Sequence, residues 1–152
     1  MTPETPLPEP PPDLRFGEIS LYFDRIVPAD PVQGFAPYYH FRILSPDGWD
    51  AGHVNLRVGD SDHITLYAGH IGYGVHESYR GAGYARLGCL AAAPFFRTIY
   101  PAVIITCDPG NRASLRTIQH LGATFLEEIP VPPHDPQYRG GSRRKLRFRW
   151  EP

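Results

Sequence analysis

Residues 69–84 read GHIGYGVHESYRGAGY, and the interpretation of the rest of the chain depends on this stretch. Its first part is apolar and suits a strand, and its second part is a glycine-rich turn before a helical pattern. Gly81 and Gly83 carry no side chains, so successive backbone N–H groups can point into one small space. First-turn amides and the helix dipole favour an anion there. The pattern predicts a phosphate cradle, although it also fits a tight turn that binds nothing.

Length and charge limit the classes of protein to consider. The chain has 152 residues, which suits one well-buried core, so we expect a single domain over residues 15–152. Its net charge of -1 gives no general attraction to nucleic acid or to an anionic membrane, so any anion site must be local. No apolar run reaches the roughly 18 residues of a membrane span. We expect no nucleic-acid partner, no membrane association, a cytoplasmic location, and a monomer or homodimer.

The first fourteen residues differ in composition from the rest of the chain. Six prolines occur among the first twelve residues, and no basic region followed by an apolar run marks a secretory signal. This composition predicts a flexible, extended tail over residues 1–14. A solvated leader and a ligand for proline-recognition modules are both compatible with it.

The cysteines and histidines indicate no metal site. Cys89 and Cys107 fall in an expected helix and an expected buried strand, so we interpret them as core residues in a reducing compartment. The seven histidines show neither HExxH nor a Cys/His zinc spacing.

The first half of the chain predicts antiparallel strands joined by short turns. Alternating apolar residues begin at Glu18, and further strands are expected at residues 38–44, 49–58 and 64–75, the last weakened by a bend near Gly69. The sequence Ser45-Pro46-Asp47-Gly48 fits a type I turn.

The second half predicts helices between strands. Residues 84–97 form an expected helix whose small residues place it close to a sheet, with Pro94 kinking or shortening it. AVIITC, residues 102–107, resembles a strand buried in a parallel sheet. Another helix starts at Asn111 as N-cap and stops at Gly122, before closing strands at residues 124–131 and 145–150.

Together these elements predict an α/β (α+β) fold. We expect a mixed, mostly antiparallel sheet of about six to seven strands with helices on both faces. The strand, helix, strand, helix order at the centre implies a right-handed crossover, so we expect the fourth and fifth strands to be a central parallel pair, splayed apart.

Two runs resemble the signatures of the Gcn5-related N-acetyltransferase (GNAT) family. Its coenzyme A-binding signature, Arg or Gln, two residues, Gly, any residue, Gly or Ala, is met by Arg80, Gly83 and Ala85. Its second signature resembles the run from Asn111 through Ser114 to Gly122. The resemblance covers residues 52–125 and is closest to the subset with Ser in the second signature, which includes enzymes that act on protein N-termini and small amines.

This resemblance implies an acetyl-CoA-dependent N-acetyltransferase in which a primary amine, of a small molecule or a peptide or protein N-terminus, attacks the thioester directly. An N–H of the strand before the turn would hold the developing oxyanion. An exposed arginine here contacts phosphate or is merely solvated. By resemblance, the pantetheine arm pairs with the backbone of Tyr73, Gly74 and Val75, the pyrophosphate lies on the amides of Arg80, Gly81, Ala82, Gly83, Tyr84 and Ala85, and the remaining cofactor-binding residues are Asn111, Ser114 and Arg116.

Two proton transfers need side chains or water. Many relatives have a tyrosine donor seven residues after the signature Asn, and here that residue is Ile118. Ser114 is the candidate donor, and the alternative is that it only bonds backbone in the first helical turn. His70, or a water near it, is the candidate base, because that strand supplies bases in some relatives; the alternative is a histidine that only packs. Asp108 and Tyr138 are weaker candidates for the base.

The acceptor side departs from the family pattern. The family places two helices between its first two strands, and residues 27–37 are too short and proline-rich for both. The acceptor cleft is then either more open or walled by other parts, of which the loop over residues 132–144 is the expected one. The arginines of this loop, Arg139, Arg143 and Arg144, suggest an acidic acceptor or are solvated.

Two other function classes remain in view. The same fold holding acyl-CoA as a sensor or structural ligand without turnover is compatible with the missing tyrosine. A phosphotransferase is disfavoured because the GxxxxGK[ST] phosphate loop is absent from the sequence.

Overall fold

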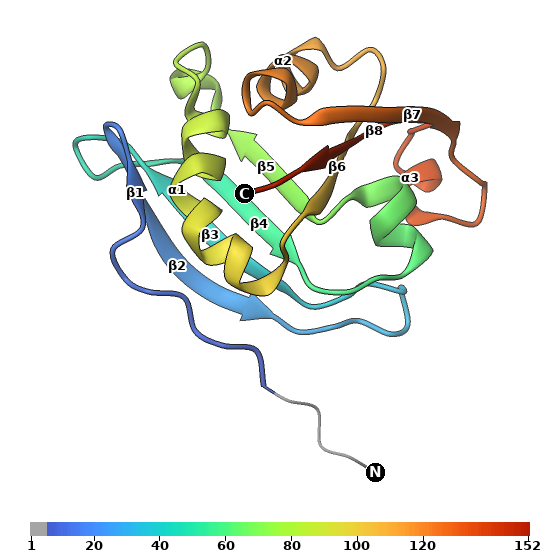
Figure 1. Ribbon diagram of the computed structural model, residues 1–152, viewed down its shortest axis with the longest axis horizontal. Helices are drawn as coiled ribbons and strands as arrows, with labels where there is room; N and C mark the ends of the chain where they lie inside the picture. Colours follow the sequence, from blue (N-terminus) through green and yellow to red (C-terminus); the bar gives the residue numbers. More distant parts are fainter. Residues whose placement is uncertain (1–5) are drawn as a thin grey trace.

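Two antiparallel sheets form the framework of the computed structural model, which describes residues 6–152. The first sheet has the order β1-β2-β3-β4-β5 and the second the order β6-β8-β7. Figure 1 shows them side by side, with the helices packed around them. The strands are β1 Arg15–Phe16, β2 Ile19–Val27, β3 Tyr38–Leu44, β4 Asp50–Arg57, β5 Ile71–Val75, β6 Val103–Cys107, β7 Thr124–Pro130 and β8 Arg144–Trp150; the helices are η1 His63–Ala68, η2 Glu77–Tyr79, α1 Tyr84–Ile99, α2 Arg112–His120 and α3 Pro136–Arg139.

The expected parallel central pair is wrong, because every strand pairing in the described residues is antiparallel. β5 and β6, the strands expected to pair, meet only where they begin. The His70 N–H donates to the Ile104 carbonyl at 2.7 Å, and the Ile104 N–H donates to Nδ1 of the His70 ring at 2.9 Å. A side chain thus takes the place of a backbone acceptor opposite Ile104, and no ladder joins the two strands in the described residues. The single sheet that we expected is therefore divided into two.

The expected strand over residues 64–75 is also shorter than predicted. Its first part is the helical turn η1, which buries Ile64 and Ala68, and only Ile71–Val75 is a strand. The turn ends at Gly69, whose φ of 76° suits glycine and produces the bend that we expected there. The four-residue spacing of Ile64 and Ala68 is typical of a helix, but the stretch is apolar throughout, so the strand prediction could not be distinguished from a helical one.

Helix α1 packs closely on the inner face of the first sheet, as its small residues predict. A Cβ added to Gly88 would lie 2.7 Å from Cδ1 of Ile43 on β3. Pro94 lies inside the helix, which continues to Ile99 and is therefore not ended by it. Phe95 and Phe96 pack edge-on against aromatic rings of β3, and this contact forms the centre of the core.

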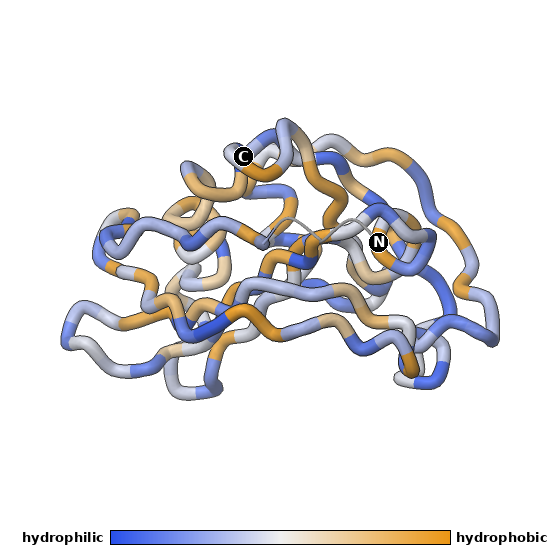
Figure 2. Tube along the Cα trace, turned by 90° about the horizontal axis from the view of Figure 1, so that it is seen from below, coloured by the Kyte–Doolittle hydropathy of each residue, from blue (hydrophilic) through white to orange (hydrophobic). Residues whose placement is uncertain are grey.

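One continuous apolar cluster joins α1 to both sheets. Figure 2 shows hydrophobic and hydrophilic segments alternating along the chain, as half-buried strands require. Cys89 and Cys107 are both buried and free, as the sequence predicts. No helix in the described part of the chain is long and apolar enough to cross a membrane.

Part of the expected flexible tail contacts this core. Leu7 packs against the cluster, Leu14 is buried, and the Tyr39 hydroxyl donates to the Pro8 carbonyl at 2.6 Å. Residues 1–5 of the expected tail lie outside the described residues.

Two local predictions about chain ends and turns are confirmed. The side chain of Asn111 accepts a hydrogen bond from the Ser114 N–H and caps α2, and Gly122 follows the helix with a φ of 77°. The Gly48 N–H donates to the Ser45 carbonyl at 2.8 Å and closes the expected turn.

The segment between β2 and β3 contains no helix. Residues 28–37 form an irregular loop with one isolated bridge between Asp30 and Phe35, as their length and prolines predict. The face of the first sheet that points away from α1 carries mainly polar side chains of β3 and β4.

Replacement of Gly88 by valine tests the close helix–sheet contact. We expect the free energy of unfolding, measured by urea denaturation, to fall by about 1–3 kcal/mol because the added side chain must displace Ile43. Gly110→Val is the matched control, since an added Cβ there meets nothing within 4 Å and the backbone φ is not positive. Equal stability of the two variants would contradict the tight packing.

Candidate functional site

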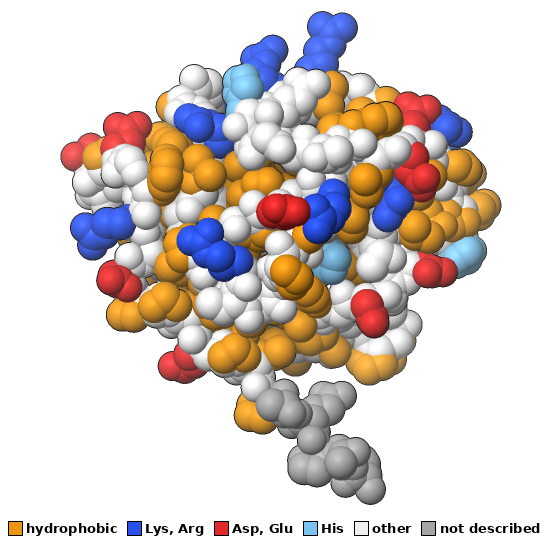
Figure 3. Space-filling view, in the orientation of Figure 1, with side chains coloured by type: hydrophobic (Ala, Val, Ile, Leu, Met, Phe, Trp, Pro, Cys, Tyr) orange, Lys and Arg blue, Asp and Glu red, His pale blue; other side chains and the backbone are white. Residues whose placement is uncertain are grey.

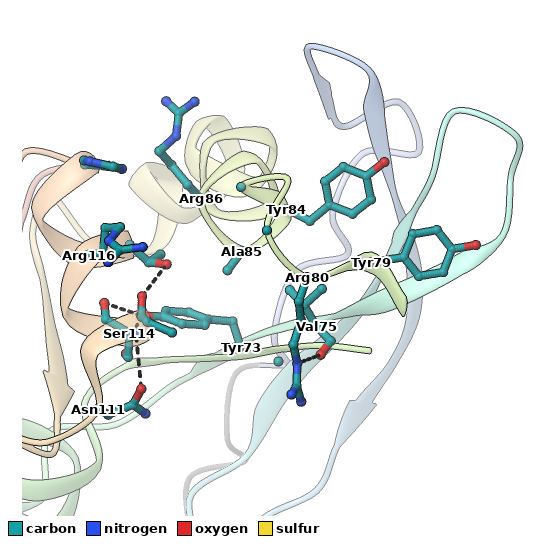
Figure 4. Close-up of a pocket in the computed structure, with 16 residues that line it drawn as sticks. Tyr73, Val75, Tyr79, Arg80, Tyr84, Ala85, Arg86, Asn111, Ser114 and Arg116 are labelled. Atoms are coloured by element: carbon teal, nitrogen blue, oxygen red, sulfur yellow. Dashed lines mark hydrogen bonds between the residues drawn. The ribbon is translucent and has the colours of Figure 1, made fainter. Parts of the chain in front are cut away.

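A cleft of about 620 Å³ lies between β5, the turn after it, the start of α1, and α2. Figure 4 shows the side chains that line it. They come from segments far apart in the sequence, which the divided sheet brings to the two sides of one opening. Its lining consists of Tyr73, Gly74, Val75, Tyr79, Arg80, Gly81, Gly83, Tyr84, Ala85, Arg86, Asn111, Ala113, Ser114, Arg116, Thr117 and His120.

Every predicted cofactor-binding residue lines this cleft except Ala82, which is exposed in the turn. The sequence interpretation missed Tyr79, Arg86 and three residues of α2. Those three are Ala113, Thr117 and His120, which repeat at the three- and four-residue spacing of one helix face. This helical periodicity is the sequence signal from which these three lining residues could have been predicted.

The turn before α1 presents free amides to the cleft. Gly81 and Gly83 have φ values of 88° and 75°, and a Cβ added to either would meet nothing within 4 Å. Their left-handed φ values favour glycine, and the missing side chains leave the turn backbone open to a ligand. The first backbone bond of the helix runs from the Leu87 N–H to the Gly83 carbonyl at 3.0 Å. The amides of Tyr84, Ala85 and Arg86 thus have no partner within the helix.

The cleft is locally cationic although the chain has a net charge of -1. Its described lining includes three arginines and no aspartate or glutamate. Arg86 and Arg116 form no ion pair within 4 Å among the described residues, and Figure 3 shows basic side chains projecting where α2 lies. Arg80 instead folds back, and its Nε donates to the Val75 carbonyl at 3.1 Å. The charge distribution suits an anionic ligand.

The edge of β5 supplies unpaired backbone groups to the same cleft. The Arg57 N–H donates to the His70 carbonyl and the His76 N–H donates to the Ala51 carbonyl, at 2.7 and 2.9 Å. Backbone groups alternate in direction along an antiparallel ladder, so those of Tyr73 face away from β4 and toward the gap between the sheets.

The same alternation distinguishes the two neighbours of Tyr73. Val75 shares its direction, whereas the backbone groups of Gly74 point toward β4. The backbone pairing that the resemblance implies is thus open at Tyr73 and at the Val75 N–H, is blocked by Arg80 at the Val75 carbonyl, and is occupied by β4 at Gly74.

Tyr73 and Ser114 meet across the cleft. The Tyr73 hydroxyl forms a hydrogen bond of 2.7 Å with Oγ of Ser114, and it also donates to the Ser114 carbonyl at 3.3 Å. Burial raises the pKa of the Tyr73 hydroxyl far above its usual range, and the bond to Ser114 opposes this only in part. The tyrosine therefore keeps its proton, and the Ser114 hydroxyl points into the cleft while its backbone N–H binds Asn111.

The candidate base His70 does not line the cleft. Its side chain is buried with 6% exposure, and its ring lies 4.7 Å from that of Tyr100. Burial lowers its pKa, and backbone hydrogen bonds with Gly59 and Ile104 oppose this. In this position His70 joins the two sheets, and it has no access to a reacting group in the cleft.

The weaker candidates for the base are also engaged elsewhere. Asp108 accepts hydrogen bonds from Lys145 at 2.8 Å and Ser142 at 2.6 Å. Partial burial raises the pKa of Asp108, but these two partners outweigh it and hold the pKa below its usual value. Tyr138 lies under the guanidinium of Arg143, 3.7 Å from the ring centre.

The loop over residues 132–144 packs beside η1 and away from the cleft. Asp135, at its centre, is buried and lies 2.9 Å from the ring of the half-buried His63. Arg144 pairs with Glu128 at 2.8 Å, and Arg143 donates to the Tyr138 carbonyl. Two of the three arginines expected to contact an acceptor therefore have partners within the chain.

Solved structures with this fold include acetyltransferases. A RimL ribosomal L7/L12 alpha-N-protein acetyltransferase is 17% identical with a TM-score of 0.58, covering 75% of this chain and 69% of that one. The microcin C7 self-immunity acetyltransferase MccE, in complex with acetyl-CoA and AMP, is 15% identical with a TM-score of 0.59, covering 76% and 61%. A GNAT-family acetyltransferase from Bacillus anthracis is 20% identical with a TM-score of 0.57, covering 74% and 65%. This chain thus spans about two thirds of their length, and the likeness concerns the fold.

No functionally curated protein sequence matches the chain. A family model does match, over residues 11–124, and its description is the acetyltransferase (GNAT) domain. That range includes β5, the glycine turn, α1 and α2, which together form the cleft. The chain therefore belongs to the GNAT acetyltransferase family.

Proposed function

We propose that this protein transfers the acetyl group of acetyl-CoA to a primary amine, carried by a small molecule or by the N-terminus of a peptide or protein. One observation carries the proposal: the unpaired edge of β5 leads directly into the amide-rich turn at the start of α1. Coenzyme A has amide groups followed by a pyrophosphate in the same order. A single extended ligand would therefore satisfy both sets of backbone groups.

The pyrophosphate end would occupy the turn. The amides of Tyr84, Ala85 and Arg86 lack helical partners, and they supply donors together with the positive end of the helix dipole. The guanidinium groups of Arg86 and Arg116 stand at the mouth of the cleft and add charge-assisted contacts.

The pantetheine arm would pair with Tyr73 and Val75 like an added strand. For this pairing Arg80 must release the Val75 carbonyl, which it holds in the absence of ligand. The freed guanidinium then lies beside the turn that receives the phosphates. An N–H of the same strand edge would hold the thioester oxygen as its negative charge develops.

Tyr73 and Ser114 would provide the proton for the departing thiolate. They form one hydrogen-bonded pair in the floor of the cleft, and burial keeps the phenol protonated. Ile118 occupies the position where many relatives carry a tyrosine, and it is completely buried. The phenol in this chain would thus come from β5 and reach the cleft from the opposite side.

A second candidate function is binding of acyl-CoA without turnover. The buried Ile118 and the closed Tyr73–Ser114 hydrogen bond favour it, because neither requires a reacting acceptor. The distinction depends on whether an amine stimulates the release of free coenzyme A.

Coenzyme A thiol release with a panel of amines and peptides tests the proposed function. We expect an acceptor-dependent rate with at least one primary amine, and calorimetric binding of acetyl-CoA in preference to ATP. Tight binding of acetyl-CoA with no acceptor-dependent release would favour the binding protein. Binding of ATP alone would contradict both functions.

Replacement of Gly83 by valine tests the phosphate cradle. We expect the Kd for acetyl-CoA to rise about tenfold or more, equivalent to about 1.4 kcal/mol, because the side chain projects into the ligand's space and strains the turn. Gly48→Val is the matched control, since Gly48 has a φ of 84° and equally open surroundings in a turn outside the cleft lining. Unchanged affinity in the Gly83 variant would argue against the cradle.

Tyr73→Phe and Ser114→Ala test the donor pair in a double-mutant cycle. We expect kcat to fall about 10²-fold in each variant, with little change in the Kd for acetyl-CoA. Because the two hydroxyls act through one hydrogen bond, the double variant should be little worse than either single variant. Full additivity, or an effect on Kd alone, would show that they do not share a proton-transfer role.

A further inference from the structure

The face of the first sheet opposite α1 carries a second cavity, of about 210 Å³. It lies between the ends of β3 and β4 and the residue that follows β5. Its lining consists of His40, Arg42, Asp50, Gly52, His53 and His76. Nothing in the function proposed above uses these side chains.

On this outer face β5 has no side chains of its own, because Gly72 and Gly74 point there, and side chains of β4 lie over it. A Cβ added to Gly74 would lie 2.8 Å from Cε1 of His53, so the imidazole rests directly on the strand. A Cβ added to Gly72 would lie 3.3 Å from the Arg57 guanidinium. Side chains alternate across a strand, so Tyr73, between the two glycines, points into the cleft on the other face. His53 and Tyr73 therefore lie on opposite faces of the strand that we propose to hold the thioester.

His53 differs from its neighbours in having free ring nitrogens. The Arg57 guanidinium donates to the Ala68 and Gly69 carbonyls. The ring of His40 lies 2.6 Å from Oδ1 of Asn55, and that of His76 lies 3.2 Å from Asp50. No hydrogen bond to the His53 ring is found within residues 6–152.

We infer that the acceptor amine reaches the thioester from this outer face and that His53 is the general base that removes the proton from its ammonium form. The inference rests on the proposed acetyl transfer. The two glycines leave β5 without side chains of its own on this face, so the His53 ring, which lines the outer cavity, lies directly against the backbone that we propose to hold the thioester.

The charges around His53 favour its neutral form. Burial lowers its pKa, electrostatic interactions with His40 and His76 lower it further, Asp50 opposes them, and Arg57 adds to the lowering. The charged groups of the neighbouring strands that face this cavity are Arg42 and, through its contacts with Arg42 and His40, Asp24. The neutral imidazole is the form that accepts a proton.

The proton balance is complete without another reactant. His53 takes one proton from the ammonium, and the amine lone pair then forms the C–N bond at the thioester carbonyl. The C–S bond breaks with its electron pair on sulfur. The nitrogen loses its second proton to water, the Tyr73–Ser114 pair gives a proton to the thiolate and regains one from water, and His53 later releases its proton to water.

His53→Gln, assayed with propylamine and its close isostere O-ethylhydroxylamine, tests the inference. Propylamine is an ammonium at neutral pH and needs a base, whereas O-ethylhydroxylamine is already uncharged. We expect kcat/KM to fall about 10²-fold with propylamine and to change little with O-ethylhydroxylamine, at an unchanged Kd for acetyl-CoA. Equal losses with both amines, or no loss with either, would overturn the assignment.

His40→Gln adds a readout that a purely structural histidine would not move. Activity is lost as pH falls through the pKa of His53, because only the neutral ring acts as a base. Replacement of the His40 imidazole removes an interaction that lowers the pKa of His53, so the acidic limb of the kcat/KM profile should move to higher pH. An unmoved limb would contradict the role of His53.

An NMR titration separates failure of this inference from failure of the proposed function. With coenzyme A bound, propylamine should shift the imidazole signal of His53, assigned by its loss in His53→Gln. If neither amine is acetylated, the proposed acetyl transfer is wrong, and this titration alone shows whether the amine binds beside His53. Shifts confined to the loop over residues 132–144 would overturn the inference.

Discussion

The structure depends on one junction, where the backbone and side chain of His70 bind the backbone of Ile104. The two sheets touch there and then separate, and the Ile104 N–H, which a parallel ladder would pair with a backbone carbonyl, binds the imidazole instead. Gly69 is required beside this junction, since an added Cβ would lie 3.0 Å from the Ile104 carbonyl and 3.1 Å from the Thr106 nitrogen. The separation leaves β5 with a free edge, and unpaired backbone groups there are costly unless a ligand or water binds them.

The free edge places two different environments on the faces of one thin strand. On the inner face, Tyr73 is half-buried, keeps its proton and contacts Ser114. On the outer face, Gly72 and Gly74 allow the cationic and imidazole side chains of β4 to lie against the backbone. The proposed proton donor and the proposed proton acceptor, held on opposite faces, are kept from neutralising each other, which suits a reaction that needs both.

Features set by short-range interactions could be predicted from the sequence. The Asn111 cap, the turn closed by Gly48 and the glycine turn before α1 each depend on a few neighbouring residues. The lining of the cleft could be anticipated because the resemblance to the family concerns contiguous runs. Features that depend on the pairing of strands could not be predicted from the sequence. Apolar residues 64–68 suit a strand or a helical turn equally, and only tertiary contacts decide between them.

The same limit explains the histidines. His70 appeared in an apparent strand near the turn and was therefore a plausible base, but its contact with Ile104 directs it away from the cleft. His53 carried no signal in the sequence, because its position over β5 depends on the pairing of His53 with Gly74. Gly74 indicates a site for the His53 ring only once the pairing of these two residues is known.

Backbone amide hydrogen exchange at β5, with and without acetyl-CoA, tests the central claim most directly. In the free protein, the amides of Gly72 and Gly74 should already be protected by β4, and those of Tyr73 and Val75 should exchange quickly. Saturating acetyl-CoA should protect Tyr73 and Val75 and leave the two glycines unchanged. Binding of acetyl-CoA that leaves Tyr73 and Val75 unprotected would contradict the account.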